Sequence, residues 1–199
     1  MYGDFTRDTF NAAYGFTRVL QQQGRVQLDA DANEQVAIFW HYLRRLAADV
    51  IGPYGGPGED PFAVEWEEDK LFVGPGVYYV DGLRCENGAR FRYDKQPDYW
   101  RDNGREEETE QALLPEPPFV VYLDVWERFL THVETEQPIR ETALNGADTS
   151  GRARIVWQVR AVSAEQAPSL MQALELAGWD YEAVPPEQVL VRASDYVDV

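Results

Sequence analysis

The chain has 199 residues, of which 44% are hydrophobic and 13% are aromatic. This composition supplies enough apolar material for a packed core and excludes wholesale disorder. The 18 Lys and Arg residues against 35 Asp and Glu residues give a formal net charge of −17. So strong a negative charge argues against nucleic acid or an anionic membrane surface as a partner.

Residues suited to metal binding and to nucleophilic chemistry are scarce. The sequence has one cysteine, Cys85, and two histidines, His41 and His132. A single cysteine excludes an internal disulfide framework and a cysteine-based zinc site. No apolar run reaches the roughly 20 residues that a membrane-spanning helix needs, and the first residues lack the basic and apolar regions of a signal peptide. We therefore expect a protein made in the cytoplasm, with no cofactor, no metal and no direct membrane insertion.

Residues 1–28 are expected to form an extended N-terminal arm. Aromatic residues recur in this segment, but they follow neither the period of a helix nor that of a strand. They need a surface to pack on, which is either the core of the same chain or a neighbouring subunit. The three arginines of the arm could pair with acidic residues that follow it. The residues that we expect at an interface are Phe5, Arg7, Phe10, Tyr14, Phe16, Arg18, Arg25, Asp29 and Asp31.

The clearest predicted element is a helix at about 32–51, which we group with the following Gly- and Pro-rich loop as segment 29–58. Asp31 and Glu34 have the spacing of a capping box, and Gly52 followed by Pro53 is a stop signal. Apolar residues recur at intervals of three and four and predict one face packed against other parts of the protein. These residues are Val36, Phe39, Trp40, Leu43, Leu46, Ala47 and Val50.

Residues 59–199 have the pattern of a mainly antiparallel β domain. The dipeptide Asp81-Gly82 between two short apolar runs is typical of a hairpin turn, because both residues tolerate positive φ. A short helix is expected at about 166–177. The predicted fold class is therefore α+β, with an extended arm, one long helix, a mainly antiparallel sheet and a short C-terminal helix. Strands are expected at 70–73, 77–81, 83–85, 90–93, 119–130, 153–162 and 188–191.

Motifs for catalysis are missing from the sequence. There is no nucleophile elbow, dinucleotide fingerprint, phosphate loop or zinc-protease motif. Asp124 and Glu127, on the strongest predicted strand, are the pair on which an acid–base hydrolase would depend. With 35 Asp and Glu residues in the chain, such a pair carries little information. We expect no enzyme, and we name no catalytic residue.

The segment from Asp29 to Asn33 begins like a calcium-binding loop, with acidic or amide side chains at alternate positions. Such a loop needs glycine at its sixth position and glutamate at its twelfth, where this chain has Glu34 and Trp40. Capping of the helix accounts for the acidic residues without a metal ion. We therefore predict no calcium site.

Several segments resemble a family of uncharacterised domains associated with phage tail-like contractile injection systems. The most specific run is Thr-Arg-Val-Leu-Gln-Gln-Gln-Gly-Arg-Val-Gln-Leu-Asp-Ala-Asp at 17–31, preceded by Gly-Asp-Phe-Thr-Arg at 3–7. Further matching pieces are 33–35, 51–53, 55–57, 78–82, 122–128, 152–154 and 156–159. These pieces are spread along the chain from residue 3 to about residue 160.

The resemblance implies a structural part of a contractile particle, at the baseplate or its periphery, as a cage, a plug or a fibre attachment. The implied partners are other particle proteins (baseplate, tube or sheath) and further copies of this chain in a homo-oligomer. The resemblance supplies no catalytic residues. The alternative function is a host-surface or carbohydrate-binding adhesin, because indole rings stack well on sugars; its candidate residues are Trp66, Trp100 and Trp179.

Overall fold

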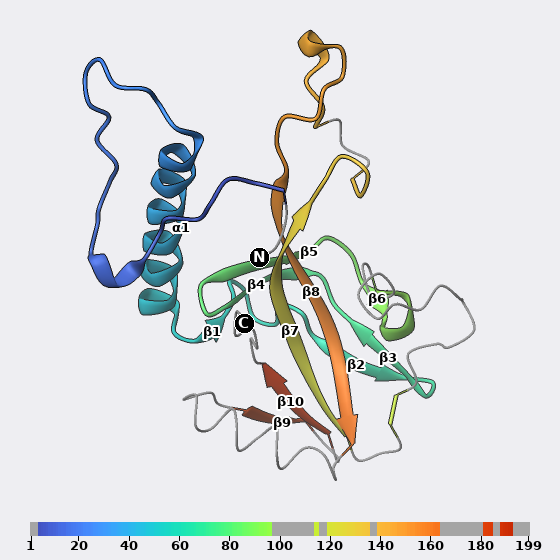
Figure 1. Cartoon of the computed structure of the whole chain (residues 1–199). Helices are drawn as coiled ribbons and strands as arrows, with labels where there is room; N and C mark the ends of the chain where they lie inside the picture. Colours follow the sequence, from blue (N-terminus) through green and yellow to red (C-terminus); the bar gives the residue numbers. More distant parts are fainter. Residues whose placement is uncertain are drawn as a thin grey trace.

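The computed structural model describes residues 4–96, 114–115, 119–135 and 139–163, and the backbone of two strands at 181–184 and 188–192. Within these ranges the chain forms one α-helix and ten β-strands (Figure 1). The elements are α1 (Asp29–Ile51), β1 (Tyr54–Gly55), β2 (Val64–Glu67), β3 (Lys70–Val73), β4 (Gly76–Val80), β5 (Leu83–Asn87), β6 (Phe91–Arg92), β7 (Phe119–Leu130), β8 (Arg152–Ser163), β9 (Tyr181–Val184) and β10 (Gln188–Arg192). Three short 3-10 turns complete the set: η1 (Ala12–Tyr14), η2 (Tyr93–Lys95) and η3 (Thr142–Leu144).

The predicted α+β class is wrong, because the described residues are mostly antiparallel β structure with a single helix. The strands form three small sheets, in the orders β1-β4-β5, β2-β3-β6 and β8-β7-β10-β9, instead of one. Their one parallel pairing joins β10 to β7. The described residues contain no short C-terminal helix, and the predicted range 166–177 lies outside them. The β content was underestimated because β1, β2 and β9 have only two to four residues each, too few to show a period of two.

The longer predicted strands are confirmed. β7 has the predicted bounds, and β8 pairs with it in antiparallel register along twelve residues, from Phe119 opposite Ser163 to Leu130 opposite Arg152. The β4–β5 hairpin turns at Asp81 and Gly82, both of which have positive φ. β8 is buried on both faces: Val159 faces the main core, while Val156 is buried but does not belong to it.

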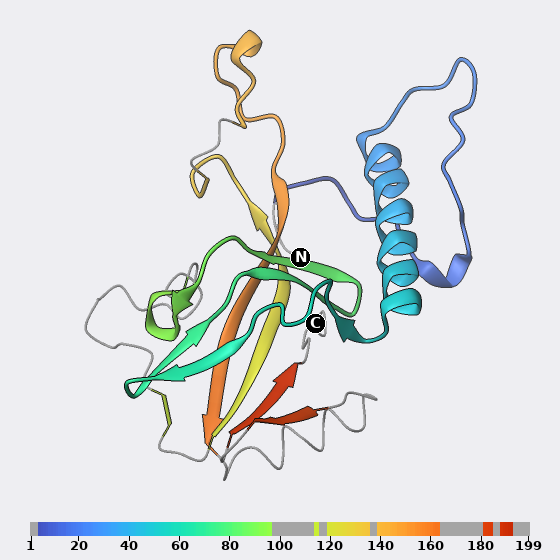
Figure 2. The ribbon, with the colours of Figure 1, turned by 180° about the vertical axis from the view of Figure 1, so that it is seen from behind.

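The main core lies between the β7–β8 pair and the two smaller sheets (Figure 2). Alternate residues of β7 point into it, which is the pattern expected of a strand with one face in the core. The fully buried members include Tyr78, Val125 and Cys85. The buried cluster comprises Phe62, Leu71, Val73, Tyr78, Val80, Leu83, Cys85, Tyr93, Phe119, Val121, Leu123, Val125 and Val159.

The exposed edge of β8 is closed by side chains of the segment around η2. The Gln96 amide accepts a hydrogen bond from the backbone N–H of Val159 (2.7 Å) and donates one to the carbonyl oxygen of the same residue (2.8 Å). The N–H of Ala161 donates to the Tyr93 hydroxyl (3.1 Å). Gln96 is buried, so these bonds are shielded from water. The two side chains therefore take the place of a neighbouring strand.

Helix α1 stands beside the sheets and is not covered by them (Figure 1). It begins at Asp29, three residues before the predicted start, and Leu28 at its N-cap makes no side-chain capping bond. The predicted capping box is therefore wrong: Glu34 instead accepts a hydrogen bond from the hydroxyl of Thr9 in the arm. The predicted end is confirmed, with the Gly52 N–H bonded to the carbonyl oxygen of Ala48 (2.8 Å). No helix among the described residues is long and apolar enough to span a bilayer.

Candidate functional site

The outer face of α1 consists of large apolar side chains that contact little else in the chain. The sequence predicted that this stripe packs against other parts of the protein, and in the single chain this prediction is wrong. The side that turns toward the β4–β5 hairpin carries Arg44 instead, and Ile38 is buried. The outer face comprises Val36, Phe39, Trp40, Tyr42, Leu43, Leu46 and Val50, whose exposed fractions run from 39% to 76%.

The arm crosses one flank of α1 and then loops away from it (Figure 1). The backbone N–H of Val19 donates to the Gln35 side chain (2.8 Å), and the Phe10 ring lies 5.3 Å from the ring of His41. Nearer its start, Phe5 packs on Phe129 of β7, with 5.2 Å between ring centroids. Part of the arm therefore folds back onto its own chain, one of the two alternatives that the sequence left open.

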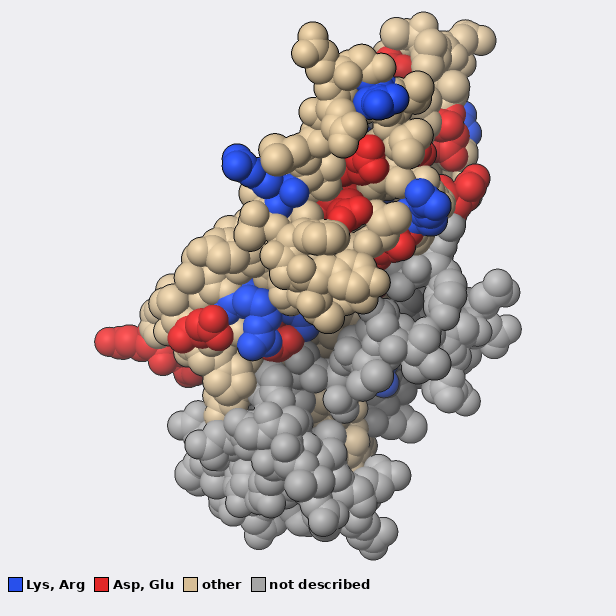
Figure 3. Space-filling model, turned by 60° about the vertical axis from the view of Figure 1, so that its left-hand side comes forward, with Lys and Arg blue, Asp and Glu red and all other residues tan. Residues whose placement is uncertain are grey.

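The rest of the arm leaves its apolar side chains in solvent. Tyr14 and Phe16 contact each other, with 5.6 Å between ring centroids, and both remain more than half exposed. Three aliphatic residues of the arm, Leu20, Val26 and Leu28, are exposed as well. We call these five residues and the outer face of α1 together the arm–helix surface. Figure 3 shows this side of the molecule, where broad uncharged surface lies between scattered acidic and basic groups.

The charged residues expected at an interface lie around this surface but do not pair with one another. Arg7, Arg18 and Arg25 are exposed, and among the described residues no ion pair joins them to Asp29 or Asp31. Asp29 instead accepts a hydrogen bond from the N–H of Ala30 (3.1 Å) in the first turn of α1. The stretch that resembled a calcium loop is therefore helical at its start.

The other residues weighed for chemistry have structural partners. Arg160 lies 2.8 Å from the carboxylate of Asp124, measured from Nε to Oδ2, whereas Glu127 is half-buried further along β7. His132 contacts Asp148, with 2.9 Å between Nδ1 and Oδ2. Cys85 is fully buried, and burial raises the pKa of its thiol to about 12. A thiol with so high a pKa is almost entirely protonated at neutral pH and therefore unreactive.

Of the tryptophans considered for an adhesin, Trp66 is described and Trp100 and Trp179 lie outside the described residues. Trp66 stands on β2, and its ring lies 5.8 Å from the Phe119 ring. It is 40% exposed, so a large part of the indole packs on the core. The observed geometry is that of a residue covering the end of β7.

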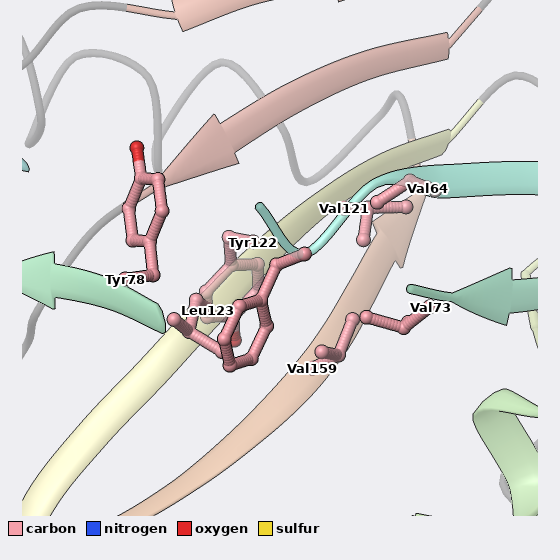
Figure 4. Close-up of a pocket in the computed structure, with 8 residues that line it drawn as sticks. Val64, Val73, Tyr78, Val121, Tyr122, Leu123 and Val159 are labelled. Carbon is pink, nitrogen blue, oxygen red and sulfur yellow. The ribbon is translucent and has the colours of Figure 1, made fainter. Parts of the chain in front are cut away.

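A small apolar gap and a polar groove lie within the described part of the chain. The first is an apolar gap of about 20 Å³ in the core, between β4, β7 and β8 (Figure 4). Val73, Val121 and Val159 line it, and it has room for about one water molecule. The second is a polar groove between β5 and β8, lined by Arg84, Glu86 and other residues. Arg84 and Glu86 already form an ion pair with each other at 2.6 Å.

The arm–helix surface is thus the most unusual feature of the described chain. Contiguous apolar patches on a protein surface commonly mark sites where another protein binds. The sequence located the helix and several arm residues, but it did not reveal that the helix face stays uncovered. Leu20, Val26 and Leu28 carried no signal of their own, because isolated aliphatic residues in an irregular segment look alike whether buried or exposed.

Comparison with known proteins places the chain in a family but assigns no activity. No curated protein and no solved structure matches it. The model of a family of unknown function, DUF6519, matches residues 1–183, which is most of the chain. The match includes the arm, α1 and β1 to β8, so the arm–helix surface lies wholly inside the matched region. The chain belongs to the DUF6519 family.

Proposed function

We propose that this chain is a structural component of a phage tail-like contractile injection system, at the baseplate or its periphery. In this proposal it acts by binding other proteins and catalyses no reaction. The assignment to a particle rests on the resemblance of segments 3–7 and 17–31 to domains associated with such systems. The assignment to protein binding rests on the arm–helix surface, and this is the observation that carries the proposal.

Physical chemistry supports a role in assembly for this surface. Apolar surface exposed on one chain is removed from water when a partner covers it, which contributes roughly 25 cal/mol per Å². The strongly negative net charge of the chain opposes nonspecific clumping, so association is favoured only where apolar surfaces fit. The arm is bonded to α1 at Thr9 and Val19, and the arm residues between these two points and after Val19 expose apolar side chains. These side chains offer such a partner adaptable contacts.

Affinity capture of the tagged protein from cells that produce it tests the proposal. The eluate is examined by negative-stain electron microscopy and by mass spectrometry. We expect tubular particles that carry sheath, tube and baseplate proteins. A lone protein of 22.8 kDa at both low and high salt would contradict the particle assignment and favour the adhesin alternative.

A pair of variants tests whether the arm contributes to the capture of particle proteins. Phe16→Asp places a charge in the exposed part of the arm, and Val133→Asp places the same charge in the turn after β7. Both positions are exposed, so neither change disturbs the core. We expect Phe16→Asp to reduce the recovered particle proteins at least about tenfold, as loss of a buried apolar contact does. Equal recovery with Phe16→Asp and Val133→Asp would show that the arm does not contribute.

A further inference from the structure

We infer that α1 pairs with α1 of a second copy of this chain, in antiparallel orientation, through its outer face. The inference names one partner of the proposed assembly protein and rests on that proposal for its biological role. The pairing itself is a property of the purified protein. Its tests therefore need no particle and give a result whether or not the particle assignment holds.

The first argument is the spacing of the exposed residues. Val36, Phe39, Leu43, Leu46 and Val50 follow one another at intervals of three, four, three and four. This is the a and d pattern of a coiled coil, in which the side chains of one helix insert between those of a partner helix with the same pattern. We call these five residues the seam.

The second argument is the direction in which the seam points. At 100° per residue, the seam lies on the side of α1 away from Arg44, which bonds to Asp81, and away from the buried Ile38. The arm contacts α1 at Gln35 beside the seam and at His41 on the opposite side, and the seam residues stay 46% to 76% exposed. The seam is therefore open along its length, and α1 is the only α-helix among the described residues that carries such a pattern. A second copy provides a matching helix.

The third argument concerns orientation and comes from the charges along α1. Its first half carries Asp29, Asp31 and Glu34, and its second half carries Arg45 and Asp49 besides Arg44, which is bonded to Asp81. A parallel pair would bring the two acidic halves together. An antiparallel pair keeps the two acidic halves apart, and it also opposes the two helix dipoles.

An antiparallel pair has a definite register when a positions face d positions. Residues then meet when their numbers add to 82, so that Val36 of one copy faces Leu46 of the other, and Phe39 faces Leu43. The flanking Trp40 lies next to its own counterpart near the two-fold axis, as a closed symmetric interface requires. The register spans 32–50, a length of about 27 Å at 1.5 Å per residue.

Sedimentation equilibrium of the full chain tests the pairing. We expect a mass of twice 22.8 kDa that falls to a single mass on dilution. Added salt should tighten the pair, because it screens the repulsion between two chains that each carry a net charge of −17. A single mass at every concentration and salt level would overturn the inference.

Two charge variants locate the interface. Leu43→Glu places a carboxylate in the middle of the seam and should weaken the pair at least about tenfold. Val133→Glu, at an exposed position away from α1, is the matched control and should leave the pair unchanged. Leu43→Met, which keeps an apolar side chain, should also pair. A dimer that tolerates Leu43→Glu as well as Val133→Glu would show that the interface lies elsewhere.

Disulfide trapping tests the orientation. Val36→Cys and Leu46→Cys are prepared as separate proteins, and the buried Cys85 gives no background. Under mild oxidation we expect a cross-linked dimer when the two are mixed and little when either is oxidised alone. Efficient cross-linking of Val36→Cys to itself, with none in the mixture, would overturn the antiparallel arrangement.

Discussion

Arg44 of α1 is bonded to both the backbone and the side chain of Asp81 in the β4–β5 turn. Its Nε donates to the Asp81 carbonyl oxygen at 2.9 Å, and its terminal nitrogen pairs with the carboxylate of the same residue. Both side chains are about one-third exposed. This bidentate contact is a main attachment of a helix whose opposite side faces solvent, and it therefore sets how the arm–helix surface is presented.

Arg44→Met removes the attachment while keeping most of the apolar stem. We expect a loss of about 1 kcal/mol in stability, since the pair is partly screened by solvent. Hydrogen exchange should localise the effect: amides of α1 lose protection while those of β7 do not. Lys70→Met, on β3 and exposed, serves as a control for the loss of one positive charge. Unchanged exchange in α1 would contradict the role assigned to Arg44.

Gly82→Ala should push α1 away from the β4–β5 hairpin, because the added methyl group collides with the helix. Gly82 has a φ of +75°, and an added Cβ would lie 2.0 Å from the carbonyl oxygen of Arg44. We expect a loss of about 2 kcal/mol or more, measured by urea unfolding, because both the backbone and the helix contact oppose the methyl group. Gly88→Ala, which meets nothing within 4 Å, should change stability by less than about 0.5 kcal/mol. Equal effects of the two substitutions would contradict the close approach at Gly82.

Gln96→Ala should destabilise the protein although it lies far from α1. It leaves the N–H and carbonyl of Val159 without the partners that bond them at 2.7 and 2.8 Å. An unsatisfied buried group costs about 1–3 kcal/mol, so we expect a loss of about 2–3 kcal/mol in urea unfolding. Gln96→Glu keeps an acceptor for the N–H but loses the donor, and it too should be destabilising. Wild-type stability in both variants would contradict the bridging role.

The strands that could be predicted from sequence are those with long patterns or a strong turn signal. β7 and β8 have twelve residues each, which is long enough for the apolar and alternating pattern of a strand to be recognised. Asp81-Gly82 predicts the hairpin turn between β4 and β5. The two-residue strand β1 was not predicted, because it forms only where β4 positions it. Pairing between distant segments is not visible in local patterns, so the division into three sheets was missed.

The first residue of α1 and the exposure of its outer face also could not be predicted from the sequence. Asp31 and Glu34 had the right spacing for a capping box, but Glu34 bonds to Thr9, twenty-five residues earlier. The apolar stripe was recognised, yet amphipathic spacing is the same whether the stripe meets the chain's own sheet or another molecule. Sequence patterns give the faces of an element but not what covers them.

The Cys85 thiol should react with a thiol reagent only when the protein unfolds. Its thiol is fully buried on β5, and its pKa is raised to about 12 by burial. We expect no reaction with a thiol reagent such as Ellman's reagent in the native protein, and rapid reaction in denaturant. Fast labelling of the native protein would contradict the burial of β5.

Glu134 should titrate below its ordinary range. The N–H of Thr131 lowers the pKa of its carboxyl most, and Arg128 at 2.8 Å lowers it further. A lowered pKa in the folded state means that the stabilisation is present above pH 4.5, the ordinary value, and is lost as the pH falls through the folded pKa.

A pH titration of the Glu134 carboxyl carbon by NMR measures this directly. We expect a pKa below 4.5 in the wild type and a smaller lowering in Arg128→Met, where the larger contribution from Thr131 remains. A midpoint at or above 4.5 would contradict the geometry of this turn.

The side chains that close the edge of β8 also have a consequence for what the protein can build. An open strand edge would allow chains to add edge to edge, strand beside strand, into fibrils without limit. Because Gln96 and Tyr93 already bond the outward groups of Val159 and Ala161, growth by strand addition is blocked along that stretch. Association at this part of β8 is then left to side-chain contacts, which do not propagate from chain to chain as a growing sheet does.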